Sequence, residues 1–209
     1  MPNRPRIRPR AAKADPDQFD LLDVPEPTAV LLTYSGRTVD LEHPDFSRFE
    51  IDDIARPLAY QCRFVGNTRS FYSVAQHCVL ASELAPPAFA YDALMHDCEE
   101  AFTGDWPTPW KIRIGRAAIR QAIRPIKRAL AERFGFRDPE SEVVKIADLR
   151  ALATELRDLC APHRLNWRDL PPPAETVILP LGPDEAMARF LERYREVAPV
   201  RQSRADARR

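Results

Sequence analysis

The sequence predicts a mainly α-helical protein with a small N-terminal β-hairpin and room for one C-terminal strand. Residues 52–197 consist largely of helical apolar patterns separated by capping and turn signals. Two apolar, β-branched runs in residues 29–41 flank Ser35-Gly36, a turn pair whose glycine can take a positive φ. Proline makes up 21 of 209 residues, roughly twice the usual 5%, and stands mostly at expected helix starts and in loops.

The first two helices follow a loop after the hairpin. The first is expected over about residues 52–63, with Pro57 tolerated only in or near its first turn. Ser73 followed by Gln76 forms a capping-box pattern, so the second helix begins next to Ser73 and ends before a proline pair. This start places His77 in the first turn of the second helix.

Proline and glycine bound the third and fourth helices. The third is expected over residues 88–103, opened by the proline pair, with Gly104 as the residue after its C-terminus. The fourth is expected over about residues 112–134, kinked at Pro125 and closed by Gly135.

Proline also marks the last elements. The fifth helix is expected from Asp138-Pro139, as N-cap and first helical residue, to about Cys160. Residues 177–179 form a short apolar run that could be a strand joining the hairpin. Pro183 opens a last amphipathic helix that ends near residue 197.

The length predicts one domain over residues 28–200 between a basic, proline-rich tail (1–27) and a second basic tail (201–209). Residues 1–13 and 201–209 together hold nine basic residues and one acidic residue. The totals are 31 of each sign, which leaves 22 basic and 30 acidic residues and a net charge near −8 for residues 14–200. We expect the ends to be disordered solubilising tails rather than nucleic-acid contacts.

The composition excludes several classes of protein. No run approaches the ~20 apolar residues of a membrane span, and no secretion signal is visible, so a cytoplasmic protein without a membrane partner is expected. Four widely spaced cysteines form no CxxC pair, which argues against disulfides and zinc fingers and favours reduced, partly buried thiols. Cys78 and Cys98 each follow a histidine or an aspartate of interest, but neighbouring helical positions point about 100° apart, which disfavours a Cys/His zinc site.

Two of the four histidines, His77 and His96, lie in the inward-facing parts of consecutive helices. Asp97 follows His96 directly, and Asp148 lies among apolar residues of the fifth helix, where a buried carboxylate needs a partner. Imidazole nitrogen and carboxylate oxygen together suit Mn, Co, Zn, Ni or Fe. The set predicts one divalent ion with coordination positions left open, as a catalytic site requires. Either histidine alone would more simply be an ordinary core residue.

Glu100 lies four residues after His96, one turn along the same face of a continuous helix. It could transfer a proton without being a ligand of the ion. The neighbouring Glu99 is expected to be solvated.

A basic stripe recurs at three- and four-residue steps through the fourth helix. It is either a solvated face or, at its first turn, a site where Lys111 and Arg113 gather the phosphates of a nucleotide. The stripe consists of Lys111, Arg113, Arg116, Arg120, Arg124, Lys127 and Arg128.

The string MHDCEEAFTGDWPTPWK (95–111), preceded by SVAQH (73–77) and followed by KIADLRAL (145–152), resembles the HD-domain metal-dependent phosphohydrolases. Within them it is similar to the YfbR-like 5′-deoxynucleotidases over about residues 50–160. The resemblance implies an HD-domain helical bundle that commonly self-associates. It also implies metal ligation by His77, His96, Asp97 and Asp148, catalysis by Glu100 and Arg63, and substrate contacts from Arg63, Phe64 and Asp105.

Two departures leave the substrate open. Tryptophan is expected where Phe64 stands, and residues 28–50 resemble instead a group of short bacterial and phage HD hydrolases, to whose broader set a phage dATP triphosphohydrolase belongs. We expect release of phosphate from (deoxy)nucleoside 5′-monophosphates. The alternatives are a dNTP triphosphohydrolase that releases triphosphate, and a non-catalytic metal-, nucleotide- or nucleic-acid-binding regulator.

Overall fold

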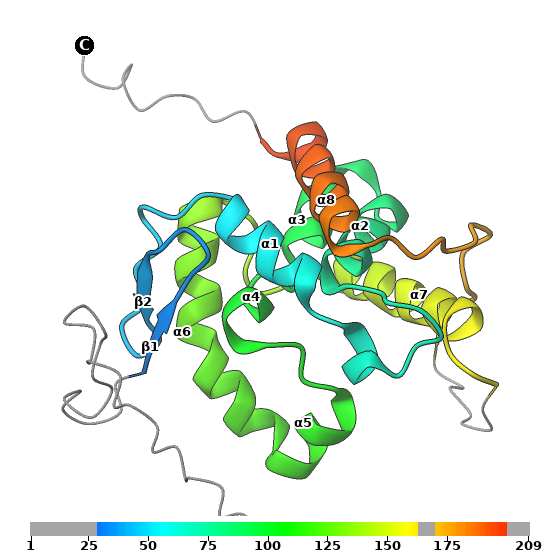
Figure 1. Cartoon of the computed structure of the whole chain (residues 1–209), viewed down its shortest axis with the longest axis horizontal. Coiled ribbons are helices and arrows are strands. Elements are labelled where there is room, and N and C mark those ends of the chain that lie inside the picture. The colour runs from blue at the N-terminus through cyan, green and yellow to red at the C-terminus, as the bar shows by residue number, and fades with distance from the viewer. Residues whose placement is uncertain (1–28, 163–169, 200–209) are drawn as a thin grey trace, which may run out of the picture.

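The computed structural model describes residues 29–162 and 170–199, and its described part is mainly helical, as predicted (Figure 1). The expected tails lie outside the described residues. None of the helices in the described ranges combines the length and the apolar character that a membrane span needs. The elements are β1 (Val30–Leu32), β2 (Thr38–Asp40), α1 (Asp52–Tyr60), η1 (Arg63–Gly66), α2 (Val74–Leu84), η2 (Pro87–Phe89), α3 (Ala90–Met95), α4 (Glu100–Thr103), α5 (Thr108–Ile114), α6 (Arg116–Phe134), α7 (Glu142–Asp158) and α8 (Pro183–Val197).

The predicted hairpin is present. Strands β1 and β2 are antiparallel, with Leu31 opposite Val39. Gly36 takes the positive φ, 78°, that the sequence pattern required of the turn. Val39 is buried and joins the main core, which anchors the hairpin to the helices.

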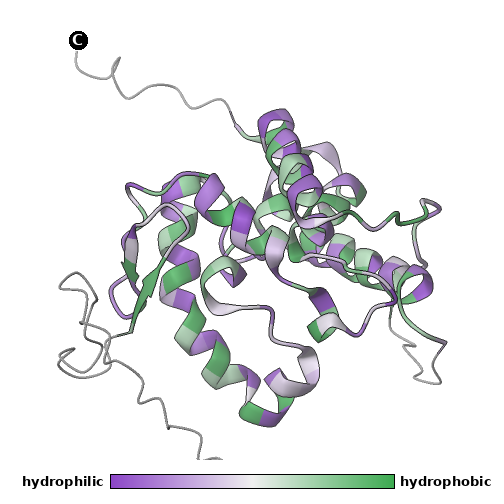
Figure 2. Ribbon diagram, viewed as in Figure 1, coloured by the Kyte–Doolittle hydropathy of each residue, from purple (hydrophilic) through white to green (hydrophobic). Residues whose placement is uncertain are grey.

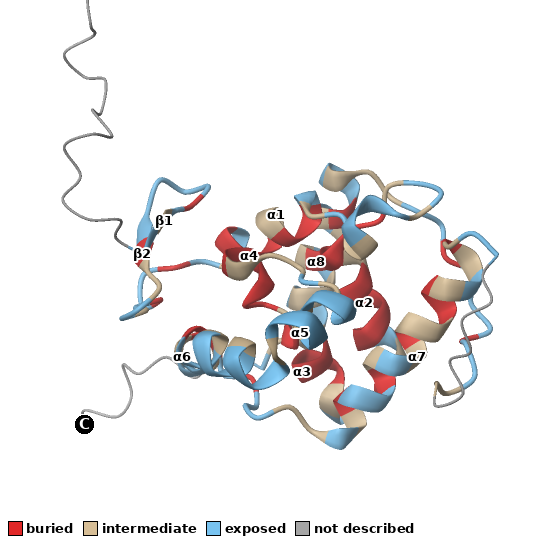
Figure 3. Cartoon of the chain, turned by 90° about the horizontal axis from the view of Figure 1, so that it is seen from below, coloured by how far each residue is buried: buried red, intermediate tan, exposed pale blue. Residues whose placement is uncertain are grey.

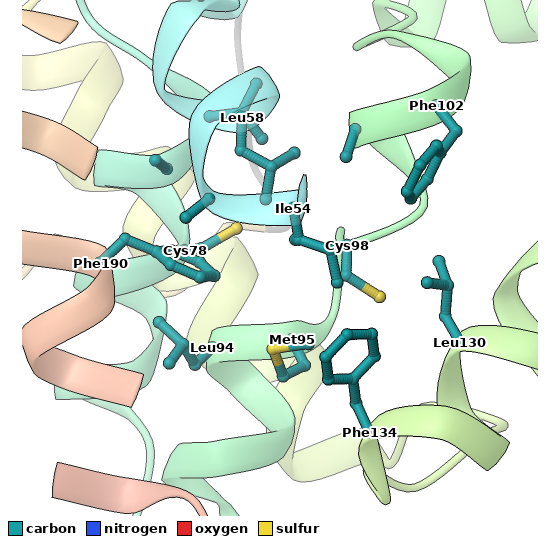
Figure 4. Close-up of a cluster of buried hydrophobic side chains, with 14 of the residues drawn as sticks. Ile54, Leu58, Cys78, Leu94, Met95, Cys98, Phe102, Leu130, Phe134 and Phe190 are labelled. Carbon is teal, nitrogen blue, oxygen red and sulfur yellow. The ribbon is translucent and has the colours of Figure 1, made fainter. Parts of the chain in front are cut away.

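Helix α2 lies at the centre of the helical body and packs against α1, α3, α7 and α8. Its side chains are buried almost all round, as expected for a helix enclosed by others. Figure 4 shows the cluster beside it, where Leu58 of α1, Leu94 of α3 and Phe190 of α8 approach one another. This core fixes the position of the α2 side chains that form the site described below.

Helices α5 and α6 form an arm, which we define as residues 108–125. Helix α5 packs mainly on α6, and α6 is held to the body by Ile126, Leu130 and Phe134 near its C-terminal end. Figure 3 shows α5 and the visible turns of α6 largely exposed, in contrast to the buried α2 and α3. Figure 2 shows hydrophobic and hydrophilic residues interspersed along the same two helices.

Several helix boundaries differ from the sequence-based prediction. The expected third helix breaks into α3 and α4, and the expected fourth breaks into α5 and α6 at Gly115, whose φ of 114° interrupts the helix. Pro57 lies beyond the first turn of α1, where it removes one backbone hydrogen bond. Helix α7 starts later than expected, after Ser141, whose hydroxyl accepts a hydrogen bond from the backbone N–H of Val144 and replaces Asp138 as the N-cap.

The predicted strand at residues 177–179 is wrong. Its backbone is bonded to side chains of helices rather than to the hairpin. Asp158 accepts from the N–H of Ile178 at 2.9 Å, and the Gln76 amide donates to the carbonyl of Leu179 at 2.7 Å. Tertiary contacts with α2 and α7 take the hydrogen bonds that a strand would have used.

Candidate metal centre

Four side chains from α2, the turn after α3, and α7 converge as the sequence predicted. The Ser73 hydroxyl caps α2 by accepting from the N–H of Gln76, and this cap fixes the turn that carries His77. The His77 Nε2 atom lies 3.3 Å from His96 Nε2 and 3.2 Å from an Asp148 oxygen. The shared Asp97 oxygen lies 3.1 Å from His96 Nε2 and 3.6 Å from His77 Nε2, and His96 Nε2 is 3.7 Å from Asp148.

The outer nitrogen of each imidazole is already engaged. His96 Nδ1 lies 2.8 Å from the carbonyl oxygen of Ala93, which can only accept, so this nitrogen carries a proton. His77 Nδ1 lies 2.7 Å from a carboxylate oxygen of Glu155, which fixes the same tautomer. In the neutral rings the two Nε2 lone pairs therefore face each other at 3.3 Å, an arrangement that needs a cation between them.

The electrostatics of the pocket also call for positive charge. Burial by itself would lower the pKa of His96, yet the carboxylates of Asp97 and Asp148 raise this pKa well above its ordinary value. Burial would raise the pKa of Asp97 in turn, but the adjacent imidazoles, His96 foremost, hold it below its usual range. Two protonated imidazoles at this separation would repel each other, so one shared metal ion satisfies the four groups better than two protons do.

The donor set fits such an ion in type and spacing. Ligand atoms bound tetrahedrally at about 2.0–2.2 Å are roughly 3.3–3.6 Å apart, and the separations of 3.1–3.7 Å between these atoms bracket that range. Ligand atoms of His77, His96 and Asp148 all lie within 4.8 Å of one another and could hold a metal ion. The same is true of Cys78, His96 and Asp97. The imidazoles are almost fully buried, whereas the side chains of Asp97 and Asp148 are 21% and 36% exposed, so solvent reaches the centre from the carboxylate side.

Glu155 is a functional residue that the motif-based reasoning missed. It is fully buried on α7, with one oxygen on His77 Nδ1 and the other 3.1 Å from Nη2 of Arg63. A carboxylate behind a ligating histidine orients the ring and increases its basicity. The available signal was its spacing, because Glu155 follows Asp148 by seven residues and so lies on the same face of the helix.

Glu100 lies beside the centre, though not for the expected reason. The helix does not continue from His96. Residues 96–99 form a tight turn with i→i+3 hydrogen bonds, including Glu100 N–H to the carbonyl of Asp97. Such a turn has about three residues per turn, so Glu100 aligns with Asp97 rather than with His96.

The Glu100 carboxyl group is buried and incompletely paired. One oxygen lies 3.6 Å from Nζ of Lys111, and the other has no hydrogen-bond partner among the described residues. Burial, followed by the charges of Asp97 and Asp105, raises the pKa of Glu100 well above its ordinary value. This carboxyl group therefore retains its proton at pH values where an exposed glutamate would have lost it.

The remaining predicted substrate residues surround the same opening to different degrees. Asp105 is held by Gln61, whose side chain accepts from the N–H of Asp105 and donates to the carbonyl of Glu100. Gln61, like Glu155, was missed. Arg63 lies against the ring of Phe64. Phe64 and Val65 both take a positive φ, which is unusual for residues other than glycine.

Lys111 reaches the site through Glu100, but Arg113 does not. Arg113 is exposed on α5 and makes no hydrogen bond or ion pair with any residue in the described ranges. Its contact with substrate stays a prediction.

Two expectations about neighbouring residues were wrong. Glu99 is buried rather than solvated, and one of its oxygens lies 3.1 Å from Nζ of Lys127, which also donates to the carbonyl of His96. Cys78 does not point away from the centre, because its sulfur lies within 4.8 Å of ligand atoms of His96 and Asp97. Burial raises the pKa of Cys78 to about 11, so it is a neutral thiol rather than a competing thiolate. All four cysteines are free, as predicted.

The fold and the site define a mainly helical protein with a buried His/Asp centre that could hold a metal ion. No family model matches the chain. It is 37% identical over 172 residues to "Uncharacterized protein YfdR" of Escherichia coli (strain K12), a match that covers 81% of this chain and 96% of YfdR. It is 36% identical over 127 residues to "Uncharacterized protein RCAP_rcc00048" of Rhodobacter capsulatus, covering 54% of this chain and 64% of that protein. The chain belongs to the family of YfdR.

Proposed function

We propose that this chain is an HD-type metal-dependent phosphohydrolase that acts on nucleotides and releases phosphate from (deoxy)nucleoside 5′-monophosphates. The observation that carries the proposal is the pair of facing histidine nitrogens, completed by two partly exposed carboxylates, with a protonated acid and an arginine at the same place. A structural metal site would be closed by its four ligands and would have no need of Glu100.

Different side chains of the protein would have different roles in phosphate-ester hydrolysis. A divalent ion held by His77, His96, Asp97 and Asp148 would supply Lewis acidity to a phosphoryl oxygen and to a water molecule. Arg63 is kept cationic and correctly placed by Glu155, so its guanidinium can bind phosphoryl oxygens and offset charge that develops on them.

Glu100 is placed to give its proton to the oxygen of the departing sugar. Asp105, on the loop that Gln61 holds, can accept a hydrogen bond from a sugar hydroxyl. These assignments suit cleavage of the bond between phosphorus and the sugar oxygen, and we propose the monophosphate as the substrate.

A dNTP triphosphohydrolase is the second candidate, and it is favoured by one observation. A basic groove along α6 adjoins Lys111 and Lys127, close to the centre. A non-catalytic regulator is the weakest candidate, because a binder has no use for a buried, protonated Glu100 beside an arginine that is held for phosphate.

A substrate panel tests the proposal. Purified protein, loaded in turn with Mn, Co, Zn, Ni or Fe, is incubated with nucleoside monophosphates and triphosphates, and the released anion is identified. We expect phosphate from deoxynucleoside monophosphates. Triphosphate release would instead establish the second candidate, and no product with any of these metals would contradict both.

Glu100→Gln tests the proton assignment within the same panel. This variant should keep its metal content and lose turnover by a factor on the order of 10²–10⁴, because the amide cannot give up a proton in the same way. Glu142→Gln is the matched control, since Glu142 is an exposed glutamate paired with Lys145 at the start of α7. Full turnover in Glu100→Gln would remove Glu100 from the reaction.

A further inference from the structure

A groove of about 910 Å³ runs along α6, on the side that faces residues 136–140. Its volume lies in the range typical of small-molecule sites. Its basic wall is formed by Lys111, Arg116, Arg120, Arg124, Lys127 and Arg128. The facing wall includes Phe136, Asp138, Pro139 and Glu140.

The structure divides the basic stripe into paired and unpaired cations. Lys111, Lys127 and Arg128 are bonded to Glu100, Glu99 and Glu132, respectively. The three arginines between them, Arg116, Arg120 and Arg124, make no ion pair or hydrogen bond with any residue in the described ranges. Because they are four residues apart, they lie on one face of α6 about 6 Å from one to the next.

Several other arginines of the described residues are paired with a carboxylate, unlike these three. Arg137 pairs with Asp92 at 3.0 Å, Arg157 with Asp158 at 2.6 Å, and Arg193 with Glu196 at 2.8 Å. Three adjacent guanidinium groups that share a groove repel one another unless an anion lies between them. Their arrangement therefore suits an anion that carries several charges along its length.

The inner end of the groove adjoins the metal centre. Lys127 lines the groove and donates to the carbonyl of His96, while Lys111 lines it and approaches Glu100. Glu140 closes the opposite wall, and one of its oxygens is buried without a partner among the described residues. A ligand lying along α6 would thus reach the opening beside His96, Asp97 and Glu100.

We propose that this groove is a second ligand site, distinct from the four metal ligands, that binds a linear polyphosphate chain such as that of a nucleoside triphosphate. Arg120 and Arg124 hold the chain, and Arg116 holds its outer end. The carboxylates of Asp138 and Glu140 on the facing wall disfavour a long nucleic-acid backbone, whereas a short polyphosphate can lie against the arginine row alone. The proposed hydrolase activity is not needed for this binding, although it would decide whether the bound nucleotide is substrate or regulator.

Isothermal titration of the full chain with inorganic tripolyphosphate and with orthophosphate, both in the presence of a chelator, tests the site. We expect tripolyphosphate to bind and orthophosphate to bind at least tenfold more weakly, since one phosphate can meet only part of the arginine row. The double variant Arg120→Ala/Arg124→Ala should weaken tripolyphosphate binding by about tenfold or more. All three arginines are exposed, so these variants are expected to fold normally, which a thermal melt checks.

The matched control removes the same charge elsewhere. Arg48→Ala/Arg195→Ala truncates two exposed arginines outside the groove and should change tripolyphosphate affinity by less than about twofold, because the remaining effect is long-range and screened by salt. An equal loss in both double variants would show only diffuse attraction and would overturn the proposal. So would equal affinity for orthophosphate and tripolyphosphate, or arginine-dependent binding of single-stranded DNA without binding of tripolyphosphate.

The experiments distinguish failure of the proposed hydrolase function from failure of the proposed groove site. Arginine-dependent tripolyphosphate binding by a protein that hydrolyses no nucleotide would contradict the proposed function and support the groove. Release of phosphate from monophosphates, combined with tripolyphosphate binding that ignores Arg120 and Arg124, would contradict the groove alone.

Discussion

Apolar and charged side chains are buried and paired in the body around α2, whereas many of them are exposed or unpaired in the arm of residues 108–125. In the body, His77 and Glu155 are fully buried and bonded to each other, and Leu58 is fully buried among apolar neighbours. In the arm, Trp110 is 56% exposed and Ile112 is 61% exposed, and Arg116, Arg120 and Arg124 have no acidic partner in the described part of the chain.

The difference indicates that the body provides stability and positions the candidate metal ligands, whereas the arm is available for ligand binding. Buried and bonded groups hold the candidate ligand atoms 3.1–3.7 Å from one another, and their loss affects both folding and the site. Exposed apolar residues and unpaired cations on the arm contribute little to folding, since their environment changes little when the chain unfolds. Substitutions in the arm should therefore affect ligand binding far more than stability.

Glu155→Ala should have the largest effect, because it breaks the most tightly bonded part of the body. It leaves Arg63 without its buried partner and His77 without its orienting carboxylate. We expect a loss of about 3–5 kcal/mol in the free energy of unfolding, measured by urea denaturation. Affinity for Zn or Mn should fall roughly 10- to 100-fold in a competition titration.

Glu142→Ala is the control for both readouts. Glu142 lies on the same helix in an exposed pair with Lys145, which contributes no more than about 1 kcal/mol. Equal stability losses in the two variants would mean that Glu155 is an ordinary surface-like carboxylate and that the body is not organised around it.

A pair of apolar truncations compares the two regions directly. Leu58→Ala should reduce the free energy of unfolding by about 2–5 kcal/mol, because it leaves a cavity in the core. Ile112→Ala on the arm should change it by less than about 0.5 kcal/mol, because Ile112 is mostly exposed. A large loss from Ile112→Ala would show that the arm is buried in the protein's working state, against a second copy or another surface.

The sequence alone predicted the helical class and the hairpin, because these depend on local patterns, and its resemblance to the HD-domain hydrolases pointed to the four candidate ligand residues that converge. The Ser73 cap and Gly36 are examples in which one residue's chemistry determines the local geometry. The contacts of Glu155 and Gln61 could not be predicted in the same way, since each joins segments far apart in the chain. The break at residues 96–99 was missed because a tight turn and a helix share the same apolar spacing over so few residues.

Ser73→Ala tests whether local capping positions a ligand in the body. Loss of the hydroxyl that accepts from Gln76 should destabilise the protein by about 1 kcal/mol and loosen the turn that carries His77. Ser141→Ala removes the equivalent cap of α7, seven residues before Asp148, and should cost a similar amount of stability. Only Ser73→Ala should also weaken Zn affinity measurably. Equal Zn affinities for the two variants would show that the Ser73 cap does not position His77 for metal binding.

The smallest effect is expected at Asp158, which fastens residues 174–178 to the end of α7. Its side chain bonds Arg157 and accepts from the N–H of Ile178, and the hydrogen bond with Arg157, foremost, lowers the pKa of Asp158 below its ordinary value. A lowered pKa in the folded state means that the stabilisation is present above the unfolded-state pKa, near 3.9, and is lost as pH falls through the folded-state pKa. The stability difference between the wild type and Asp158→Asn should therefore be largest near neutral pH, stay below about 1 kcal/mol because the Arg157 side chain is 36% exposed and solvent screens the pair, and shrink below about pH 4. Urea denaturation at pH 7 and pH 3 measures this difference. A difference that is the same at both pH values would mean that the shape of the side chain, rather than its charge, holds the segment against α7.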